Sequence, residues 1–206
     1  MLQAFLHGII LAFGLILPLG VQNVFVFSQG ATQPTFMRAL PVVITASLCD
    51  TLLIALAVLG VSLIVLTFTW LKATLFTIGF FFLLYMGWVT WRSESQIKNG
   101  GHQSLPPKRQ IIFAASVSLL NPHAILDTIG VIGTSSLTYN GSEKWTFALS
   151  CILISYLWFF GLAIAGRALG TLDRSGRWMK TINRISALLI WGVACYMAVQ
   201  LITELS

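Results

Sequence analysis

The chain has 206 residues, of which 57% are hydrophobic and only 9% are charged, and its mean hydropathy is +0.87. Soluble globular domains carry about 25% charged residues, so this composition excludes a soluble enzyme. The net charge of +6 is therefore no sign of nucleic-acid binding. We expect an all-α integral membrane protein.

Six apolar stretches are long enough to cross a bilayer, which takes about 20 residues of helix. No Lys or Arg precedes the first stretch and no small-residue cleavage site follows it, so we expect a permanent helix and not a signal peptide. The stretches leave almost no soluble part, and residues 1–206 form a single transmembrane domain. The expected helices cover residues 2–28, 39–68, 71–91, 111–137, 145–169 and 183–203.

The first and fourth expected helices are each interrupted by a proline among polar side chains. A freed backbone group costs several kcal/mol in hydrocarbon, so such a break survives only where protein or a water-filled cavity satisfies it. Paired breaks in the two halves of a chain indicate a substrate site near the bilayer midplane. The residues at the first break are Pro18, Gly20, Gln22 and Asn23, and those at the second are Asn121, Pro122, His123 and Asp127.

The chain divides into two halves of three helices, 1–92 and 111–206, on either side of a polar loop at 93–110. Aligning residue n with residue n + 104 places Pro18 on Pro122 and Asn23 on Asp127. An odd number of helices per half means that the halves insert with opposite topology. We therefore expect six transmembrane helices arranged as two inverted three-helix repeats, with helices one and four broken.

Asp50 and Asp127 are the two acidic residues that fall well inside expected helices. An aspartate at the centre of a membrane helix costs about 2.5 to 3.5 kcal/mol, and such residues usually serve a transport pathway. The alternative is a purely structural role, in which each carboxylate pairs with a buried cation or a helix end. No Lys or Arg lies in mid-span, however, so the missing positive charge fits a cationic substrate. A carboxyl group here could also bind a proton when the site is empty and release it when a cation binds.

The amides beside the breaks have two possible roles. Gln22, Asn23 and Asn121, with the backbone at Gly20, suit the charged amino and carboxylate groups of an amino acid. They can equally satisfy the backbone groups that the prolines free. His123 lies four residues before Asp127 and could neutralise it, relay a proton or cap the broken helix.

The tryptophans and cysteines give weaker evidence about function. Trp158 and Trp191 lie in mid-span, where a ring that faces lipid is the default expectation. The three cysteines have no metal-ligand spacing, so we expect them to be small core residues. We expect no metal and no cofactor.

The placement of Lys and Arg predicts the orientation of the chain. Ten of the twelve follow the first, third and fifth helices, and only Lys72 and Lys144 lie on the other side. By the positive-inside rule, the long basic loops are cytoplasmic and both termini lie outside.

At these residues the sequence resembles the lysine/arginine exporter family (LysE and ArgO type), whose members carry L-P-L-G-P-Q-N in the first helix and N-P-H-x-x-L-D in the fourth. Here the elements read L-P-L-G-V-Q-N at 17–23 and N-P-H-A-I-L-D at 121–127. The second element is complete. The first departs at Val21, where the family usually has a second proline.

The resemblance implies secondary active export of basic L-amino acids, arginine or lysine, across the bacterial plasma membrane. It also implies coupling to the membrane potential or to protons, and often a homo-oligomer such as a homodimer. Asp50, Asp127, Gln22, Asn23, Asn121 and His123 are the expected substrate-binding residues, and Pro18, Gly20 and Pro122 the expected hinge. The alternative is export of a neutral amino acid or another small cationic metabolite. A membrane-embedded enzyme or a purely structural subunit fits the paired polar breaks less well.

Overall fold

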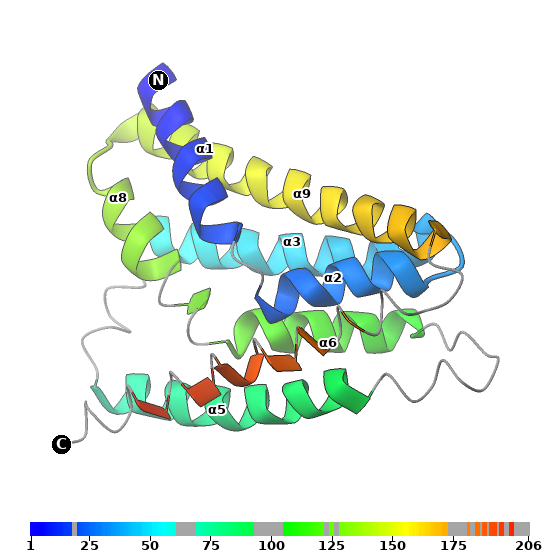
Figure 1. Ribbon diagram of the computed structural model, residues 1–206. Coiled ribbons are helices and arrows are strands. Elements are labelled where there is room, and N and C mark those ends of the chain that lie inside the picture. The colour runs from blue at the N-terminus through cyan, green and yellow to red at the C-terminus, as the bar shows by residue number, and fades with distance from the viewer. Residues whose placement is uncertain are drawn as a thin grey trace.

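A computed structural model describes most of the chain, and every element in the described part is a helix (Figure 1). The described residues are 1–17, 20–60, 69–92, 105–121, 124–125, 128–172, 181, 184–185, 187–188, 190–192, 194–195 and 198–199. The elements are α1 (Leu2–Ile16), α2 (Val21–Thr32), α3 (Phe36–Val58), α5 (Thr69–Arg92), α6 (Pro107–Leu119), the π-helix η2 (Thr128–Gly133), α8 (Thr134–Ser136) and α9 (Gly141–Leu172).

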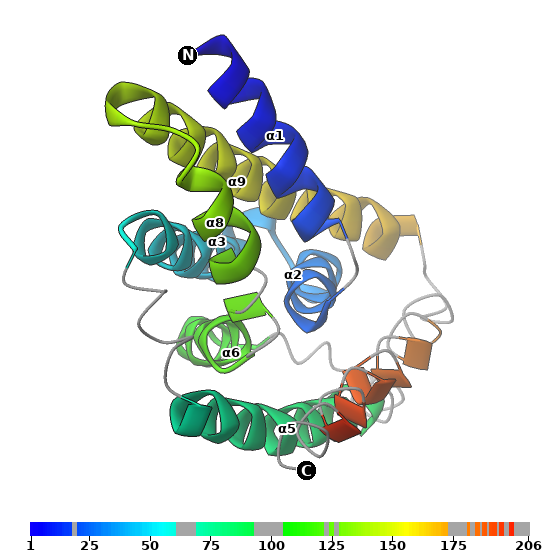
Figure 2. The same ribbon diagram turned by 90° about the vertical axis from the view of Figure 1, so that its left-hand side faces the viewer.

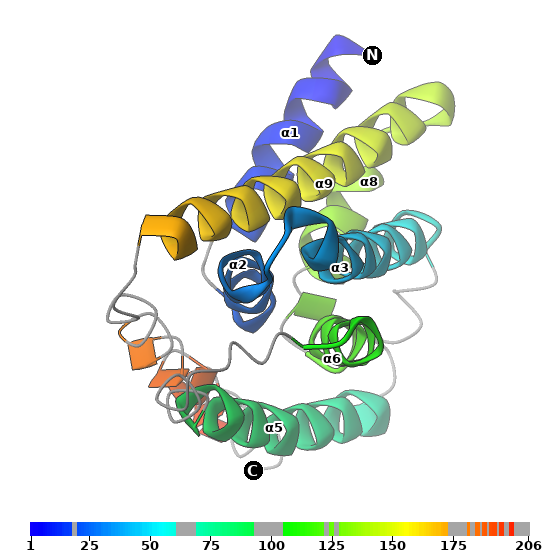
Figure 3. The same ribbon diagram turned by 90° about the vertical axis from the view of Figure 1, so that its right-hand side faces the viewer.

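The long helix α9 lies across the rest of the bundle. It packs on α1, α2 and α3, while α3 also packs on α6 and η2. Seen end-on from both sides, α2 and α3 lie next to each other beneath α9, α6 lies beneath α3, and α5 lies beyond α6 (Figures 2 and 3). Helix α3 therefore lies at the centre of the described bundle, in contact with elements from both halves of the chain.

Several helices match the predicted membrane spans. Helices α3 and α9 are each long and apolar enough to cross a bilayer, and α1 with α2 qualifies as one span bent by 81°. Helix α5 contains the predicted span 71–91, and α9 contains the predicted span 145–169. The predicted span 39–68 begins inside α3, whose described course ends at Val58, and residues 61–68 lie outside the described part.

The breaks in the first and fourth spans are visible in the element bounds. Helix α1 ends at Ile16 and α2 begins at Val21, with extended backbone at Gly20. In the fourth span, α6 ends at Leu119, and the next described elements are the π-helix η2 and the short α8. π-Helical turns are rare and frequently occur at functional sites.

The contact between α2 and α9 is close because glycines face backbone. A Cβ added to Gly30 would lie 2.2 Å from the carbonyl oxygen of Ala163, and one added to Gly166 would lie 2.1 Å from that of Phe27. Small residues let membrane helices approach closely enough for backbone contact. This contact fixes the position of α2, which begins at the first break, against α9.

Three buried glutamines join helix ends on the side where α2 ends and α3 begins. Gln33 Nε2 donates to Gln29 Oε1 and to the carbonyl oxygen of Leu105, both at 3.0 Å. Gln110 Nε2 donates to the same Leu105 oxygen at 2.8 Å and to the carbonyl oxygen of Arg38 at 2.9 Å. The glutamine cluster (Gln29, Gln33 and Gln110) thus ties the start of α6 to the turn between α2 and α3.

Candidate functional site

The first break is closed by a side chain of the following helix. Asn23, in the first turn of α2, donates from Nδ2 to the carbonyl oxygen of Ile16, the last residue of α1, at 2.7 Å. A helix end leaves its last carbonyls without partners, and in a membrane such groups must be satisfied internally. Asn23 therefore satisfies backbone at the break, one of its two expected roles. Pro18 lies outside the described residues.

Asp50, near the middle of α3, faces the same break. Gln22 Nε2 donates to Asp50 Oδ1 at 3.1 Å, and the hydroxyl of Ser155 on α9 donates to Oδ2 at 2.8 Å. Each carboxylate oxygen thus has one neutral donor, from a different helix. The structure brings together two expected site residues, Gln22 and Asp50, and adds Ser155 from the second half of the chain.

Trp158 completes this arrangement, one helical turn after Ser155 on α9. Its indole Nε1 donates to Asn23 Oδ1 at 3.2 Å, and its ring meets the ring of Phe13 edge-on at a centroid distance of 5.6 Å. A ring that faces lipid is the default expectation for this tryptophan, whereas the half-buried ring also bonds a polar group at the break. We call the set formed by Gln22, Asn23, Asp50, Ser155 and Trp158 the polar junction.

The charge of the polar junction has no cationic partner in the part of the chain that the structure describes. There, the one ion pair joins the Met1 amine to Glu143, whereas Asp50 accepts only from an amide and a hydroxyl. Neutral donors to a carboxylate reduce its desolvation cost without cancelling its charge. The site can therefore bind a further cation.

The second break is described less completely. The carbonyl oxygen of Asn121 accepts from the backbone N–H of Ile125 at 3.1 Å, just after α6 ends. Pro122, His123 and Asp127 lie outside the described residues. Their expected roles remain predictions.

Sequence reasoning did not find Ser155 or the glutamine cluster as components of a site. Ser155 is one of several serines in apolar spans, and its position beside Tyr156 and near Trp158 did not by itself mark it as a site residue. Gln29 and Gln33 did carry a signal, since two amides one turn apart near a span end suggest a shared partner. The other partner of Gln33, Leu105, is 72 residues away and could not be identified from local sequence.

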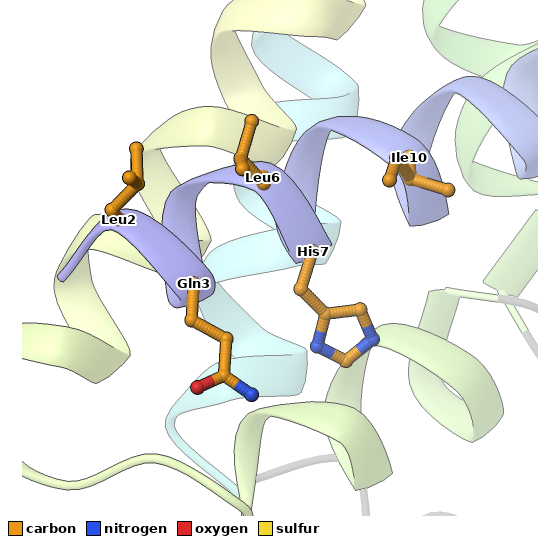
Figure 4. A pocket seen from close by; sticks show the side chains of 5 residues that line it. All are labelled: Leu2, Gln3, Leu6, His7 and Ile10. Carbon is orange, nitrogen blue, oxygen red and sulfur yellow. The ribbon is translucent and has the colours of Figure 1, made fainter.

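A second candidate location is an open depression of about 640 Å³ along α1 (Figure 4). No acidic side chain is among the residues that line it, which are Leu2, Gln3, Leu6, His7 and Ile10. His7 is bound through Nδ1 to the hydroxyl of Tyr139 at 2.9 Å. This mostly apolar surface lacks the charge that a cation site needs, so the polar junction is the better candidate.

Comparison with known proteins identifies the family of this helical membrane protein. Residues 13–201 match the family described as LysE type translocator, and the chain belongs to this family. It is a transporter and not an enzyme. No solved structure matches the chain.

Two kinds of relative are informative, and both match over nearly their full length. A Bacillus subtilis (strain 168) protein described as "Putative amino-acid transporter YisU" is 58% identical over 200 residues, covering 97% of this chain and 91% of the relative. The arginine exporter protein ArgO of Shigella flexneri is 32% identical over 202 residues, covering 96% of this chain and 94% of the relative. ArgO of Escherichia coli (strain K12) is 31% identical over the same coverage.

Proposed function

We propose that this protein is a secondary active exporter of basic L-amino acids, arginine or lysine, in the bacterial plasma membrane. The observation that carries the proposal is Asp50, a carboxylate in the middle of a membrane helix whose described partners are the neutral groups of Gln22 and Ser155. Its insertion cost of about 2.5 to 3.5 kcal/mol favours a functional role. A substrate with a positive side chain supplies the charge that the described site lacks.

The relatives support the substrate class. Two of those reported are named as arginine exporters, and YisU is named as an amino-acid transporter without a stated substrate. The site supports a cationic amino acid more than a neutral one, because a substrate with a net positive charge offsets the charge of Asp50, whereas a zwitterion with no net charge leaves it uncompensated. Asp127, His123 and Asn121 at the second break are proposed to contribute a second carboxylate, a proton-binding group and an amide to the same site.

The proposed inverted repeat is the arrangement that transport by alternating access uses, and the element bounds support it. At the n + 104 offset, the end of α1 at Ile16 matches the end of α6 at Leu119 to within one residue. The start of α3 at Phe36 matches the start of α9 at Gly141 equally closely. Both halves thus have a helix, a break and then a long helix in the same order, and the polar junction contains side chains from both halves.

The proposed orientation rests on where the helices begin and end. Helices α2, α5 and α9 end at the side of the bundle where α3 and α6 begin (Figure 1). The guanidinium of Arg167 donates there to the carbonyl oxygens of Gln33 and Pro34, each at 3.3 Å. Basic residues gathered at one end support a cytoplasmic location for this end.

Uptake of labelled arginine and lysine into proteoliposomes tests the function, with proton gradient and membrane potential imposed separately. Homoserine and leucine serve as competitors. Saturable flux that only basic amino acids inhibit is the expected result. Flux inhibited by neutral amino acids would favour the alternative, and no flux of either kind would overturn the proposal.

A further inference from the structure

The hydroxyl of Ser155 departs from the usual behaviour of hydroxyls in this bundle. In an apolar helix, a serine or threonine normally donates to a carbonyl three or four residues earlier. Several hydroxyls in the described helices do so, among them those of Thr32, Thr45, Thr51, Ser118 and Ser150. Ser155 is 2% exposed and donates across to Asp50, 105 residues away in sequence.

The carboxylate of Asp50 keeps acceptor capacity for a further donor. A carboxylate has about four lone-pair sites on its two oxygens. Gln22 and Ser155 occupy one site on each oxygen, at 3.1 Å and 2.8 Å. A cation with several N–H groups can therefore bind Asp50 without displacing both neutral donors.

Ser155 can itself bind such a cation. A hydroxyl has one donor and two acceptor lone pairs, so the oxygen that donates to Asp50 can at the same time accept an N–H from a group bound there. The Gln22 amide likewise has an acceptor oxygen beside its donating nitrogen. The cation would then meet a carboxylate and two neutral acceptors, which suits the several N–H groups of a guanidinium or an ammonium.

We propose that Ser155 is a substrate-binding residue contributed by the second half of the chain, which holds Asp50 while the site is empty and accepts a hydrogen bond from the cationic end of the substrate when it is bound. This inference rests on the proposed function and extends it to α9. It places the substrate's charged end between α3 and α9, so the substrate contacts both halves.

Three variants in proteoliposomes test the inference. Ser155→Ala removes the hydroxyl, and Ser155→Thr keeps it. Ser150→Ala removes a hydroxyl on the same helix that donates to the backbone carbonyl oxygen of Phe147. We expect Ser155→Ala to raise the KM for arginine about tenfold, because a hydrogen bond to a charged group is lost. The maximal rate should change less than about twofold. Ser155→Thr should restore the KM to within about threefold of the original, and Ser150→Ala should leave it unchanged.

A second measurement separates binding from folding. The melting temperature of each purified variant is compared with and without arginine, since a ligand that binds the folded state raises it. We expect Ser155→Ala to need about tenfold more arginine than the original protein for the same increase in melting temperature above its own value when empty. An unchanged KM and an unchanged arginine response in Ser155→Ala would overturn the inference. So would a lower melting temperature and maximal rate without a change in KM, because that pattern indicates a structural role.

The outcomes also separate this inference from the proposed function. If the unmodified protein transports arginine and Ser155→Ala has the same KM, only the inference fails. If the unmodified protein neither transports nor binds arginine or lysine, the proposed function fails and the inference fails with it.

Discussion

The side chain of Asn23 bonds the carbonyl oxygen of Ile16 at 2.7 Å and so joins the two parts of a broken membrane helix. The same side chain accepts the indole N–H of Trp158 at 3.2 Å. One amide therefore connects the end of α1, the start of α2 and the middle of α9. Because Asn23 is 5% exposed, both ends of its amide act away from solvent. The break is held by these specific hydrogen bonds.

Replacing Asn23 with Ala should destabilise the protein. The carbonyl of Ile16 and the indole of Trp158 each lose a partner, and a buried unsatisfied group costs about 1 to 3 kcal/mol. The melting temperature of the purified protein in detergent measures the effect. An unchanged melting temperature would mean that other groups satisfy the break.

Replacing Asp50 with Asn should reduce arginine and lysine flux at least tenfold, because the amide has similar size but no charge to attract the substrate. The dependence of this flux on pH should also change. The measurement is uptake into proteoliposomes at matched protein content. Glu143→Gln is the control, since it removes an acid that pairs with the Met1 amine away from the polar junction. An unaltered flux and pH profile would assign Asp50 a structural role.

Replacing Asp127 with Asn should abolish transport without lowering the amount of protein in the membrane. The substitution removes the second carboxylate that we propose for the site, while an amide is cheaper than a carboxylate to keep in hydrocarbon. Immunoblotting of membranes with parallel uptake assays measures both quantities. Robust flux would contradict the assignment of Asp127 to the site.

Replacing Gly166 with Ala should separate α2 from α9 and destabilise the protein. The new Cβ would lie 2.1 Å from the carbonyl oxygen of Phe27, which is backbone and cannot rotate away. Overpacking of this kind typically costs about 1 to 3 kcal/mol. The control is Gly161→Ala on the same helix, where nothing lies within 4 Å of the added atom. Equal melting temperatures for the two variants would show that the close contact does not limit stability.

Cysteine labelling checks the proposed orientation. A membrane-impermeant thiol reagent should label Lys144→Cys on intact cells and label Lys108→Cys only after permeabilisation. Both residues are near helix starts, Lys144 in α9 and Lys108 in α6, and the two starts lie at opposite ends of the bundle in Figure 1. A background without the native Cys49, Cys151 and Cys195 provides the starting protein. The reverse labelling pattern would show that the chain has the opposite orientation.

The sequence by itself determined the helical class, the positions of several spans and the break after α1. These features follow from local chemistry: long apolar stretches form helices in lipid because every backbone group must be satisfied, and Pro18 cannot donate a backbone hydrogen bond. Asp50 could also be singled out from sequence, because a charged residue in the middle of a membrane helix is costly whichever residues it contacts.

Only the tertiary structure decided which side chains meet Asp50 and Asn23. Ser155 and Trp158 come from a helix more than 100 residues away in sequence, and their neighbours in the chain would fit a lipid-facing surface equally well. The close packing of glycines between α2 and α9 turns these two residues toward the break. Such long-range partners depend on helix rotation and approach, which local sequence patterns do not specify.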